Sequence, residues 1–190
     1  MRRLVVASQN PDKVAEVEEV LAGLANHIDI VRGLAWPEVE ETEPTLEGNA
    51  LLKARAVVAA TGIAALSDDT GLEVAALGGE PGVHTARYAG PDASYAENIA
   101  KVLAELEGVA DRSARFRTVV ALVSPEGEVE TAEGVLEGRI ISQPRGESGF
   151  GYDPIFEVDG RTLAEIPSEE KHRISHRGKA LKAMAELLGA

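Results

Sequence analysis

The stretch LVVASQNPDKV, residues 4–14, decides the fold class of this chain of 190 residues. Its first four residues are apolar and rich in β-branched side chains, which is typical of a buried strand. Asn10 suits a helix N-cap and Pro11 suits the first helical position, so a helix is expected to begin directly after the strand. A strand, a tight turn and a helix in this order point the free amides of the helix N-terminus at an anion.

Outward from this stretch, helix and strand patterns are mixed along the chain. Capping residues and apolar spacing predict helices that begin near Asn10, Thr45, Ser94 and either Ser168 or Ser175. Strands are predicted over residues 28–31, 64–66, 72–75, 116–123 and 128–140, and loops over 67–71, 78–90 and 144–154. The last two strands form an antiparallel hairpin, which argues against a purely parallel sheet. The expected class is therefore α/β with a mixed sheet.

The composition describes a single domain over residues 1–190. Hydrophobic residues make up 44% of the chain and charged residues 27%, as in ordinary globular domains. The absence of cysteine excludes a disulfide scaffold, a thiolate nucleophile and a cysteine-ligated zinc site.

Charge and hydropathy narrow the expected partners. Lys and Arg number 19 against 32 Asp and Glu, and this net charge of −13 repels a polyanion, so nucleic acid is not an expected partner. No apolar run approaches the ~20 residues of a membrane span, and the apolar run near the N-terminus is too short for a signal peptide. A cytoplasmic protein without a membrane partner is expected.

Residues 8–13, SQNPDK, are the first candidate for chemistry. A lysine in the first turn of a helix opposes the helix dipole, so Lys13 is easier to explain if an anion binds there. The alternative is a plain N-cap beside a solvated lysine. The segment lacks the glycines of a P-loop.

Two pairs of neighbouring acids, Glu40-Glu41 and Asp68-Asp69, are the second candidate. Mg²⁺ prefers oxygen ligands and commonly takes one or two carboxylates together with substrate phosphates. A carboxylate beside the metal can also accept a proton from water. For the glutamates the alternative is a solvated acidic loop. The aspartates lie between apolar strands, where two charges need a cation or hydrogen bonds to offset them.

Two further segments combine features of a binding site. Residues 148–154, SGFGYDP, place Phe150 between glycines, so that its ring can stack on a flat ligand; the alternative is a tight turn with a core phenylalanine. Residues 171–179, KHRISHRGK, concentrate basic side chains in an acidic chain. They suit phosphate or the edge of a base, and a solvated helix face is the alternative. His172 and His176 have the i, i+4 spacing of metal ligands but lack an obvious third ligand nearby.

Taken in order, these segments resemble the inosine triphosphate pyrophosphatase family, also called XTP/dITP diphosphatases. The matching motifs are Ser8…Asn10…Lys13, Glu40-Glu41-Thr42, Asn49–Ala54, Ser67–Leu72, Gly78–Gly82, Ala86–Tyr88, Phe150–Phe156 and Ser175–Gly178. Their common order over nearly the whole chain makes the resemblance specific. The chain departs from the family pattern at Gln9, where glycine is frequent, at Gly48, where glutamate is frequent, and at His84-Thr85.

The resemblance implies hydrolysis of ITP, dITP and XTP to the nucleoside monophosphate and pyrophosphate, with Mg²⁺ as the cofactor and a homodimer as the assembly. It also implies an elongated fold of two lobes around a long mixed sheet, with the active site in the cleft between them. Two alternatives stay open: a pyrophosphatase for another modified nucleotide, and a nucleotide-sensing module without turnover. The second is expected to lack catalytic acids, which this chain retains at Asp68, Asp69 and Glu40.

The resemblance further implies a role for each matching residue. The triphosphate-binding motif of the family matches Ser8, Asn10 and Lys13, of which Lys13 stabilises phosphate charge. The residues between them, Gln9, Pro11 and Asp12, are expected to bind substrate in the same turn. The metal-binding acids match Glu40 and Asp69, and Asp69, or Asp68 beside it, accepts a proton from the attacking water. Thr70 matches a substrate contact. The base pocket matches Phe150, Gly151, Tyr152 and Asp153, and residues that contact phosphate and base match Lys171, His176 and Arg177.

Overall fold

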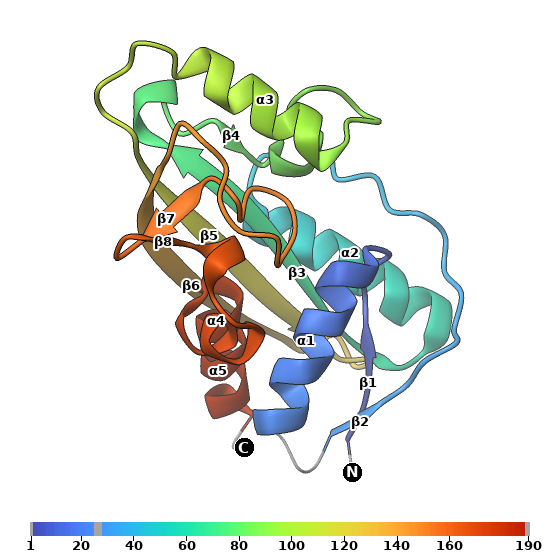
Figure 1. Cartoon of the computed structure of the whole chain (residues 1–190). Helices are drawn as coiled ribbons and strands as arrows, with labels where there is room; N and C mark the ends of the chain where they lie inside the picture. Colours follow the sequence, from blue (N-terminus) through green and yellow to red (C-terminus); the bar gives the residue numbers. More distant parts are fainter. Residues whose placement is uncertain (1, 25–27, 189–190) are drawn as a thin grey trace. The chain divides into compact units, whose positions relative to one another are not determined.

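The computed structural model describes residues 2–24 and 28–188 (Figure 1). Its helices are α1 (Pro11–Leu24), α2 (Leu46–Thr61), α3 (Tyr95–Glu105), α4 (Ser168–Ile174) and α5 (His176–Leu187), with short 3₁₀ turns η1 (Ala75–Leu77), η2 (Thr85–Arg87) and η3 (Leu163–Glu165). Its strands are β1 (Arg2–Val6), β2 (Ile28–Ile30), β3 (Ala64–Val74), β4 (Pro81–Gly82), β5 (Ser113–Val123), β6 (Val129–Ile140), β7 (Phe156–Val158) and β8 (Arg161–Thr162).

The described strands form one eight-stranded open sheet in the order β2-β1-β3-β5-β6-β7-β8, with β4 beside β3. β1 pairs in parallel with both neighbours, so that Leu4 lies opposite Ile30 in β2 and Ala64 in β3. β4 pairs antiparallel with β3, β7 with β6, and β8 with β7. The sheet is therefore mixed, and the α/β class predicted from the sequence is confirmed.

By their internal contacts, the residues separate into two compact units. The first unit consists of Met1–Asp69, Thr118–Gly134 and His176–Ala190, and the second of Thr70–Arg117 and Val135–Ser175. Each of the long strands β3, β5 and β6 contributes residues to both units. One domain over residues 1–190, and a cleft between two lobes, stay predictions.

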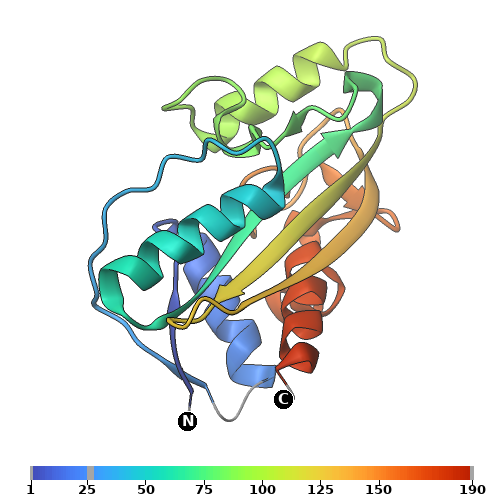
Figure 2. The same cartoon turned by 180° about the vertical axis from the view of Figure 1, so that it is seen from behind.

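Helices cover both faces of the sheet in the first unit. Successive residues of a strand point to opposite faces, and accordingly Leu4 and Val6 pack with side chains of α1 and α5, whereas Val5 packs with side chains of α2. The same alternation continues along β3, where Leu66 faces α1 and α5, and Ala65 faces α2. Figure 1 shows α1 and α5 in front of the strands, and Figure 2 shows α2 in front of the opposite face.

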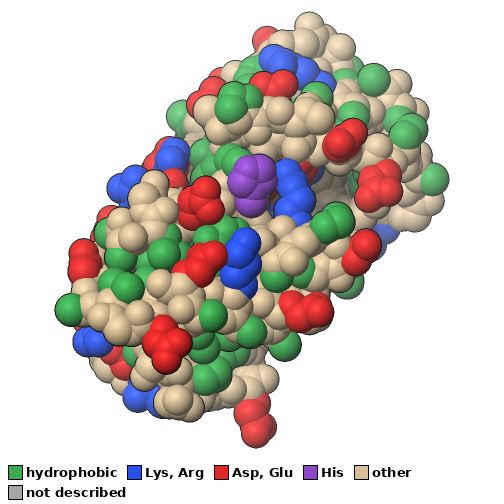
Figure 3. All heavy atoms as spheres, turned by 90° about the horizontal axis from the view of Figure 1, so that it is seen from above, with side chains coloured by type: hydrophobic (Ala, Val, Ile, Leu, Met, Phe, Trp, Pro, Cys, Tyr) green, Lys and Arg blue, Asp and Glu red, His purple; other side chains and the backbone are tan. Residues whose placement is uncertain are grey.

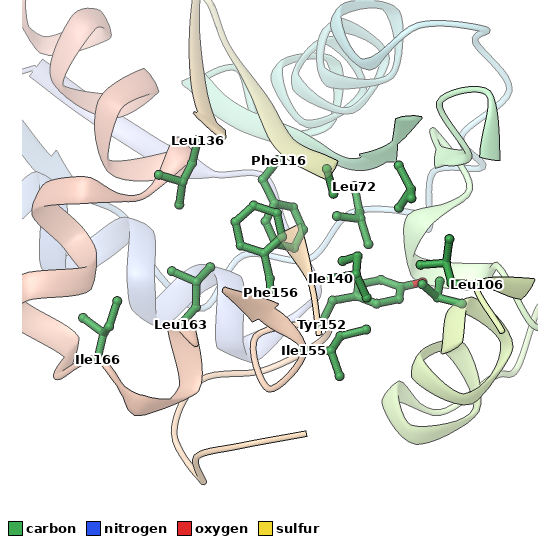
Figure 4. Close-up of a cluster of buried hydrophobic side chains, with 13 residues drawn as sticks. Leu72, Leu106, Phe116, Leu136, Ile140, Tyr152, Ile155, Phe156, Leu163 and Ile166 are labelled. Atoms are coloured by element: carbon green, nitrogen blue, oxygen red, sulfur yellow. The ribbon is translucent and has the colours of Figure 1, made fainter. Parts of the chain in front are cut away.

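The second unit is built around a buried aromatic pair (Figure 4). The rings of Phe116 in β5 and Phe156 in β7 have centroids 4.6 Å apart and planes tilted by 49°, an arrangement that aromatic rings favour over a face-to-face sandwich. Tyr152 joins this core, and its hydroxyl donates a hydrogen bond of 2.8 Å to the carbonyl of Thr85. Tyr152, which the sequence assigns to a base pocket, is thus also a buried core residue.

The predicted helix starts are confirmed by their capping bonds. The Thr45 hydroxyl accepts from the backbone N–H of Gly48 at 3.0 Å, and Ser94 and Glu97 form the predicted capping box. β5 and β6 are adjacent in the sheet and joined by a tight turn in which the N–H of Ser124 donates to the carbonyl of Glu128. The predicted hairpin is therefore present.

One predicted boundary is wrong. Residues 67–71 are not a loop: β3 runs without interruption from Ala64 to Val74 and carries Asp68 and Asp69 inside the sheet. Cations from three helices offset their charge there, which the local sequence does not reveal. Of the two starts predicted for the last helix, Ser175 is confirmed: its extended backbone (ψ 157°) ends α4, which begins at Ser168, and α5 begins directly after it.

On the face shown in Figure 3, acidic side chains are spread widely and basic side chains lie among them. None of the described helices is long and apolar enough to span a membrane.

Candidate active site

The turn before α1 has the geometry that its sequence predicts. The Asn10 side-chain oxygen accepts hydrogen bonds from the backbone N–H groups of Asp12 at 3.0 Å and Lys13 at 3.3 Å. The Ser8 hydroxyl accepts from the N–H of Asn10 at 3.2 Å. The Lys13 ammonium lies 3.6 Å from a carboxylate oxygen of Asp68. Lys13 is therefore not a solvated lysine, whereas Gln9, Pro11 and Asp12 are exposed.

Asp68 lies at the centre of a buried ion-pair network. Its Oδ2 accepts from Nε of Arg177 at 3.2 Å, and the same guanidinium donates to Glu16. Asp68 and Arg177 are both only 2% exposed. Burial alone would raise the pKa of Asp68, but the charges of Lys13, Arg177 and Lys53 together hold it far below its usual range. Asp68 is therefore an ionised anchor for two cations.

Asp69 has different surroundings on the other face of β3. Its Oδ1 lies 3.4 Å from Nζ of Lys53, which also contacts Glu41 at 2.6 Å. Its Oδ2 is buried without a hydrogen-bond partner in the part of the chain that the structure describes. Burial raises the pKa of Asp69, and although Lys53 and Lys13 lower it, Glu41 and Asp68 add to the rise. Asp69 thus has one carboxylate oxygen without a hydrogen-bond partner among the described residues, and its pKa is raised.

Sheet alternation accounts for this difference between neighbours. Asp68 shares the face of Leu66, toward α1 and α5, which carry Lys13 and Arg177. Asp69 shares the face of Ala65, toward α2, which carries Lys53. Because adjacent strand residues point to opposite faces, each carboxylate meets a different set of cations.

The donor atoms around Asp69 fit the Mg²⁺ ion that the resemblance implies. The partnerless Oδ2 of Asp69 and the carboxylate of Glu41 are oxygen ligands of the kind that this cation prefers. No cluster of three or more His, Asp or Glu side chains suited to a metal occurs among the described residues. Glu40, the predicted ligand, is exposed, and its neighbour Glu41 is half-buried beside Lys53.

The second unit holds a different cluster in the loop 148–154. The Asp153 carboxylate accepts from the N–H of Phe150 and from Nζ of Lys171, both at 2.8 Å. The Lys171 ammonium lies 5.1 Å from the centre of the Phe150 ring, and the Tyr95 ring lies 6.1 Å from it. A Cβ at Gly149 would stand 2.1 Å from the Asp153 carboxylate, and the backbone there is left-handed (φ 76°), so glycine is favoured in this turn.

This loop presents the Phe150 ring and does not bury it. Phe150 is half-buried, whereas the core rings of Phe116 and Phe156 are at most 4% exposed. The alternative of a core phenylalanine is therefore wrong. Gly151 takes a left-handed backbone (φ 61°) between Phe150 and Tyr152, which glycine adopts without strain.

The basic segment 171–179 is not one surface patch. Lys171 belongs to the second unit, and His176 and Arg177 begin α5 in the first unit. All three are buried. Nδ1 of His176 lies 2.6 Å from the hydroxyl of Thr118. The alternative of a solvated helix face is therefore wrong for these three residues.

The structure brings together some of the predicted residues and adds others. In the first unit it joins Lys13, Asp68 and Arg177, and it links Asp69 to them through the shared strand. In the second unit it joins Phe150, Asp153 and Lys171, and Thr70 is the first residue of that unit. No role was predicted for Glu16 and Lys53, which complete the first set, and Glu41 was named only as part of the acid pair Glu40-Glu41. The quoted motif Asn49–Ala54 contained Lys53, and its charge in a helix with a buried face was the available signal.

A model of the Ham1 family matches residues 4–187. The chain belongs to the Ham1 family. A "dITP/XTP pyrophosphatase" of Geobacter sulfurreducens is 48% identical over 194 residues, which cover 100% of this chain and 98% of that protein. One of the same name from Bacillus subtilis is 45% identical, with coverage of 100% and 98%.

A solved Ham1 structure supports the same assignment at the level of the fold. The HAM1 protein from Coxiella burnetii superposes with a TM-score of 0.90 at 45% sequence identity, covering 100% of this chain and 99% of that one. The family resemblance drawn from the motifs is therefore confirmed, and the acid cluster and the Phe150 loop are features of a Ham1 protein.

Proposed function

We propose that this Ham1 protein hydrolyses deaminated purine nucleoside triphosphates, ITP, dITP and XTP, to the monophosphate and pyrophosphate. The observation that carries the proposal is the buried Asp68-Asp69 pair. The Asp68 carboxylate is held ionised, and Asp69 has one oxygen without a hydrogen-bond partner among the described residues. Relatives that align over their whole length and are named dITP/XTP pyrophosphatases support the substrate class.

Phosphate chemistry is assigned to the first unit. The N-terminus of α1 offers backbone amides and a positive dipole to an anion, and Lys13 and Lys53 add two ammonium groups beside the acids. Phosphoryl transfer depends mainly on positioning and on stabilising charge. These cations therefore serve to bind the triphosphate and to stabilise the charge that develops on the leaving pyrophosphate.

Asp69 is assigned as the proton acceptor for the attacking water. A general base works best when its pKa approaches the working pH, and burial moves the pKa of Asp69 in that direction. Asp68 is assigned a holding role, because Lys13 and Arg177 keep it ionised and its pKa low. Asp69, and not Asp68, is therefore the proton acceptor that we propose.

We also assign Mg²⁺ as the cofactor, held by Asp69 and Glu41 together with substrate phosphate. When bound, the ion neutralises phosphate charge and orients the triphosphate. Lys53 contacts both carboxylates. It therefore keeps the two acids close to each other when no metal ion is bound.

Base recognition is assigned to the Phe150 loop in the second unit. The half-buried Phe150 ring offers a stacking surface, and Asp153 fixes both its backbone and Lys171. Hypoxanthine and xanthine present a 6-keto acceptor where adenine has an amino donor. A buried donor, such as a backbone N–H of this loop, therefore favours the keto bases by up to ~10⁴–10⁵. A homodimer, which the family resemblance implies, and a location in the cytoplasm complete the proposal.

The proposal is tested by measuring pyrophosphate release from ITP, XTP, dITP, ATP and GTP, with Mg²⁺ and with a chelator. Release from the deaminated purines alone, abolished by the chelator, is expected. Equal release from all five nucleotides would contradict base selection in the Phe150 loop. Binding without release would favour a nucleotide-sensing module, and preference for another modified base would favour a different pyrophosphatase.

A further inference from the structure

Residues 31–45, here called the Glu41 segment, form neither helix nor strand. This segment places the Glu41 carboxylate in contact with Lys53. Near one end, the half-buried Trp36 packs against the apolar cluster that includes Ala54 and Val57 of α2. Near the other end, Thr45 caps α2. The Thr45 bond lies within the start of the helix, so the segment depends on contacts such as that of Trp36 to keep one of its side chains in place.

Asn49 supplies the anchor nearest to Glu41. It is fully buried in the first turns of α2, and its side-chain oxygen accepts a hydrogen bond of 2.9 Å from the backbone N–H of Glu43. Gly48 permits this approach, because a Cβ there would stand 2.7 Å from the Cβ of Glu43. The segment is thus tied to α2 two residues after Glu41.

The same turns of α2 also hold the strand that carries Asp69. The hydroxyl of Ser67 donates to the carbonyl of Ala50 at 2.5 Å. Lys53 lies one helical turn after Asn49, on the same side of the helix, and contacts both Glu41 and Asp69. Asn49 and Ser67 therefore set the distance between the two acids that Lys53 bridges.

Stability alone does not explain an amide at position 49. Its Nδ2 is buried and has no acceptor among the residues that the structure describes. A buried donor without a partner destabilises the folded state, and an apolar side chain of the same shape removes that cost. Glu43 is exposed, and its hydrogen bond to Asn49 is only partly buried.

We propose that Asn49 is a positioning residue, which fixes the Glu41 segment on α2 so that Glu41 stays beside Lys53 and Asp69. The inference rests on the proposed function for its catalytic consequence. Asn49 itself touches neither reacting atoms nor metal. Its bond to Glu43 acts through the backbone that carries Glu41.

The test compares Asn49→Leu with Thr45→Ala, a change at the same end of α2. Asn49→Leu removes the bond to Glu43 together with the partnerless donor, so kcat/KM for dITP is expected to fall by about 10- to 100-fold while the melting temperature does not fall. Thr45→Ala removes only the helix cap, so the melting temperature is expected to fall while kcat/KM measured well below it stays at the wild-type value. Asn49→Ala, a smaller side chain, repeats the test if leucine prevents folding.

The single tryptophan gives a second readout that needs no activity. Trp36 lies in the Glu41 segment, and loosening of the segment in Asn49→Leu is expected to increase quenching of its fluorescence by acrylamide, with no increase in Thr45→Ala. Wild-type kcat/KM in Asn49→Leu, or lost activity with unchanged quenching, would overturn the proposal. If the wild-type protein hydrolyses no nucleotide, the proposed function fails, and the quenching comparison still decides whether Asn49 holds the segment.

Discussion

Asp68 and Asp69 are neighbours on β3, yet their carboxylates meet different cations on opposite faces of the sheet. Asp68 accepts from Arg177 at 3.2 Å, and Asp69 lies 3.4 Å from Lys53 with one oxygen left without a partner among the described residues. Burial acts on both, but the cations around Asp68 outweigh it and those around Asp69 do not. One short stretch of strand therefore provides an ionised anchor and a proton acceptor.

Substitution of the two aspartates is expected to separate activity from stability. Asp69→Asn removes the proton acceptor, so kcat is expected to fall by about 10²–10⁴. The melting temperature of the metal-free protein is expected to rise, because a buried carboxylate with a raised pKa is unfavourable in its ionised form. Asp68→Asn leaves Arg177 and Lys13 without their shared anion, so its melting temperature is expected to fall. Pyrophosphate release and thermal melting of both variants check this, and wild-type turnover by Asp69→Asn would disprove its role.

The lowered pKa of Asp68 predicts a loss of stability in acid. The unfolded carboxyl has a pKa of about 3.9, and the folded one lies below it. A group of this kind stabilises the fold above the unfolded pKa, and the contribution is lost as the pH falls through the folded pKa. Urea unfolding from pH 7 to acid is expected to show a steeper decline for the wild type than for Asp68→Asn. Parallel curves would show that the Asp68 network adds no stability.

Removal of Asp153 is expected to damage the Phe150 loop. Asp153→Ala leaves Lys171 buried without its carboxylate, a type of change that costs about 3–5 kcal/mol. In the double variant Asp153→Ala with Lys171→Met no charge is left unpaired, so it is expected to be less destabilised than the two single changes added together. Urea unfolding of all four proteins measures this coupling. Strict additivity would mean that the 2.8 Å contact contributes nothing.

The contact between α5 and β6 depends on Gly134. A Cβ at this position would stand 2.0 Å from the backbone oxygen of His176 and 2.5 Å from the nitrogen of Ala180. Because both are backbone atoms at the start of a helix, neither can swing aside. Gly134→Ala is expected to lower the free energy of unfolding by about 1–3 kcal/mol, as measured in urea. A stability equal to wild type would show that α5 shifts freely.

Local signals predicted the parts of the fold that are held by local bonds. Asn10 and Pro11 predicted the start of α1, and Ser94 with Glu97 predicted the start of α3, because the hydrogen bonds of each cap join residues only two or three positions apart. The interruption predicted at residues 67–71 was wrong for the opposite reason. Asp68 stays inside β3 because Lys13 and Arg177, 55 residues before and 109 residues after it, offset its charge.

In the candidate site, too, the features that depend on the local sequence were predicted, and those that depend on distant residues were not. The types of residue that carry chemistry were visible in the motifs, and Lys13, Asp68 and Asp69 do meet in the first unit. Glu16 and Lys53 were not predicted, because a charged residue on a helix normally faces solvent, and only the three-dimensional position of β3 gives them a buried partner.

The most direct test of the central claim compares kcat/KM for dITP and dATP with the wild-type protein and Mg²⁺. The two nucleotides share sugar and triphosphate, and their bases differ at position 6, where an oxygen replaces the amino group, and at N1, which carries a hydrogen in hypoxanthine. Pyrophosphate release from dITP at least about 100-fold more efficient than from dATP is expected, since a donor in the base site leaves adenine unsatisfied. Equal kcat/KM for the two nucleotides would contradict the claim that this protein selects deaminated purines.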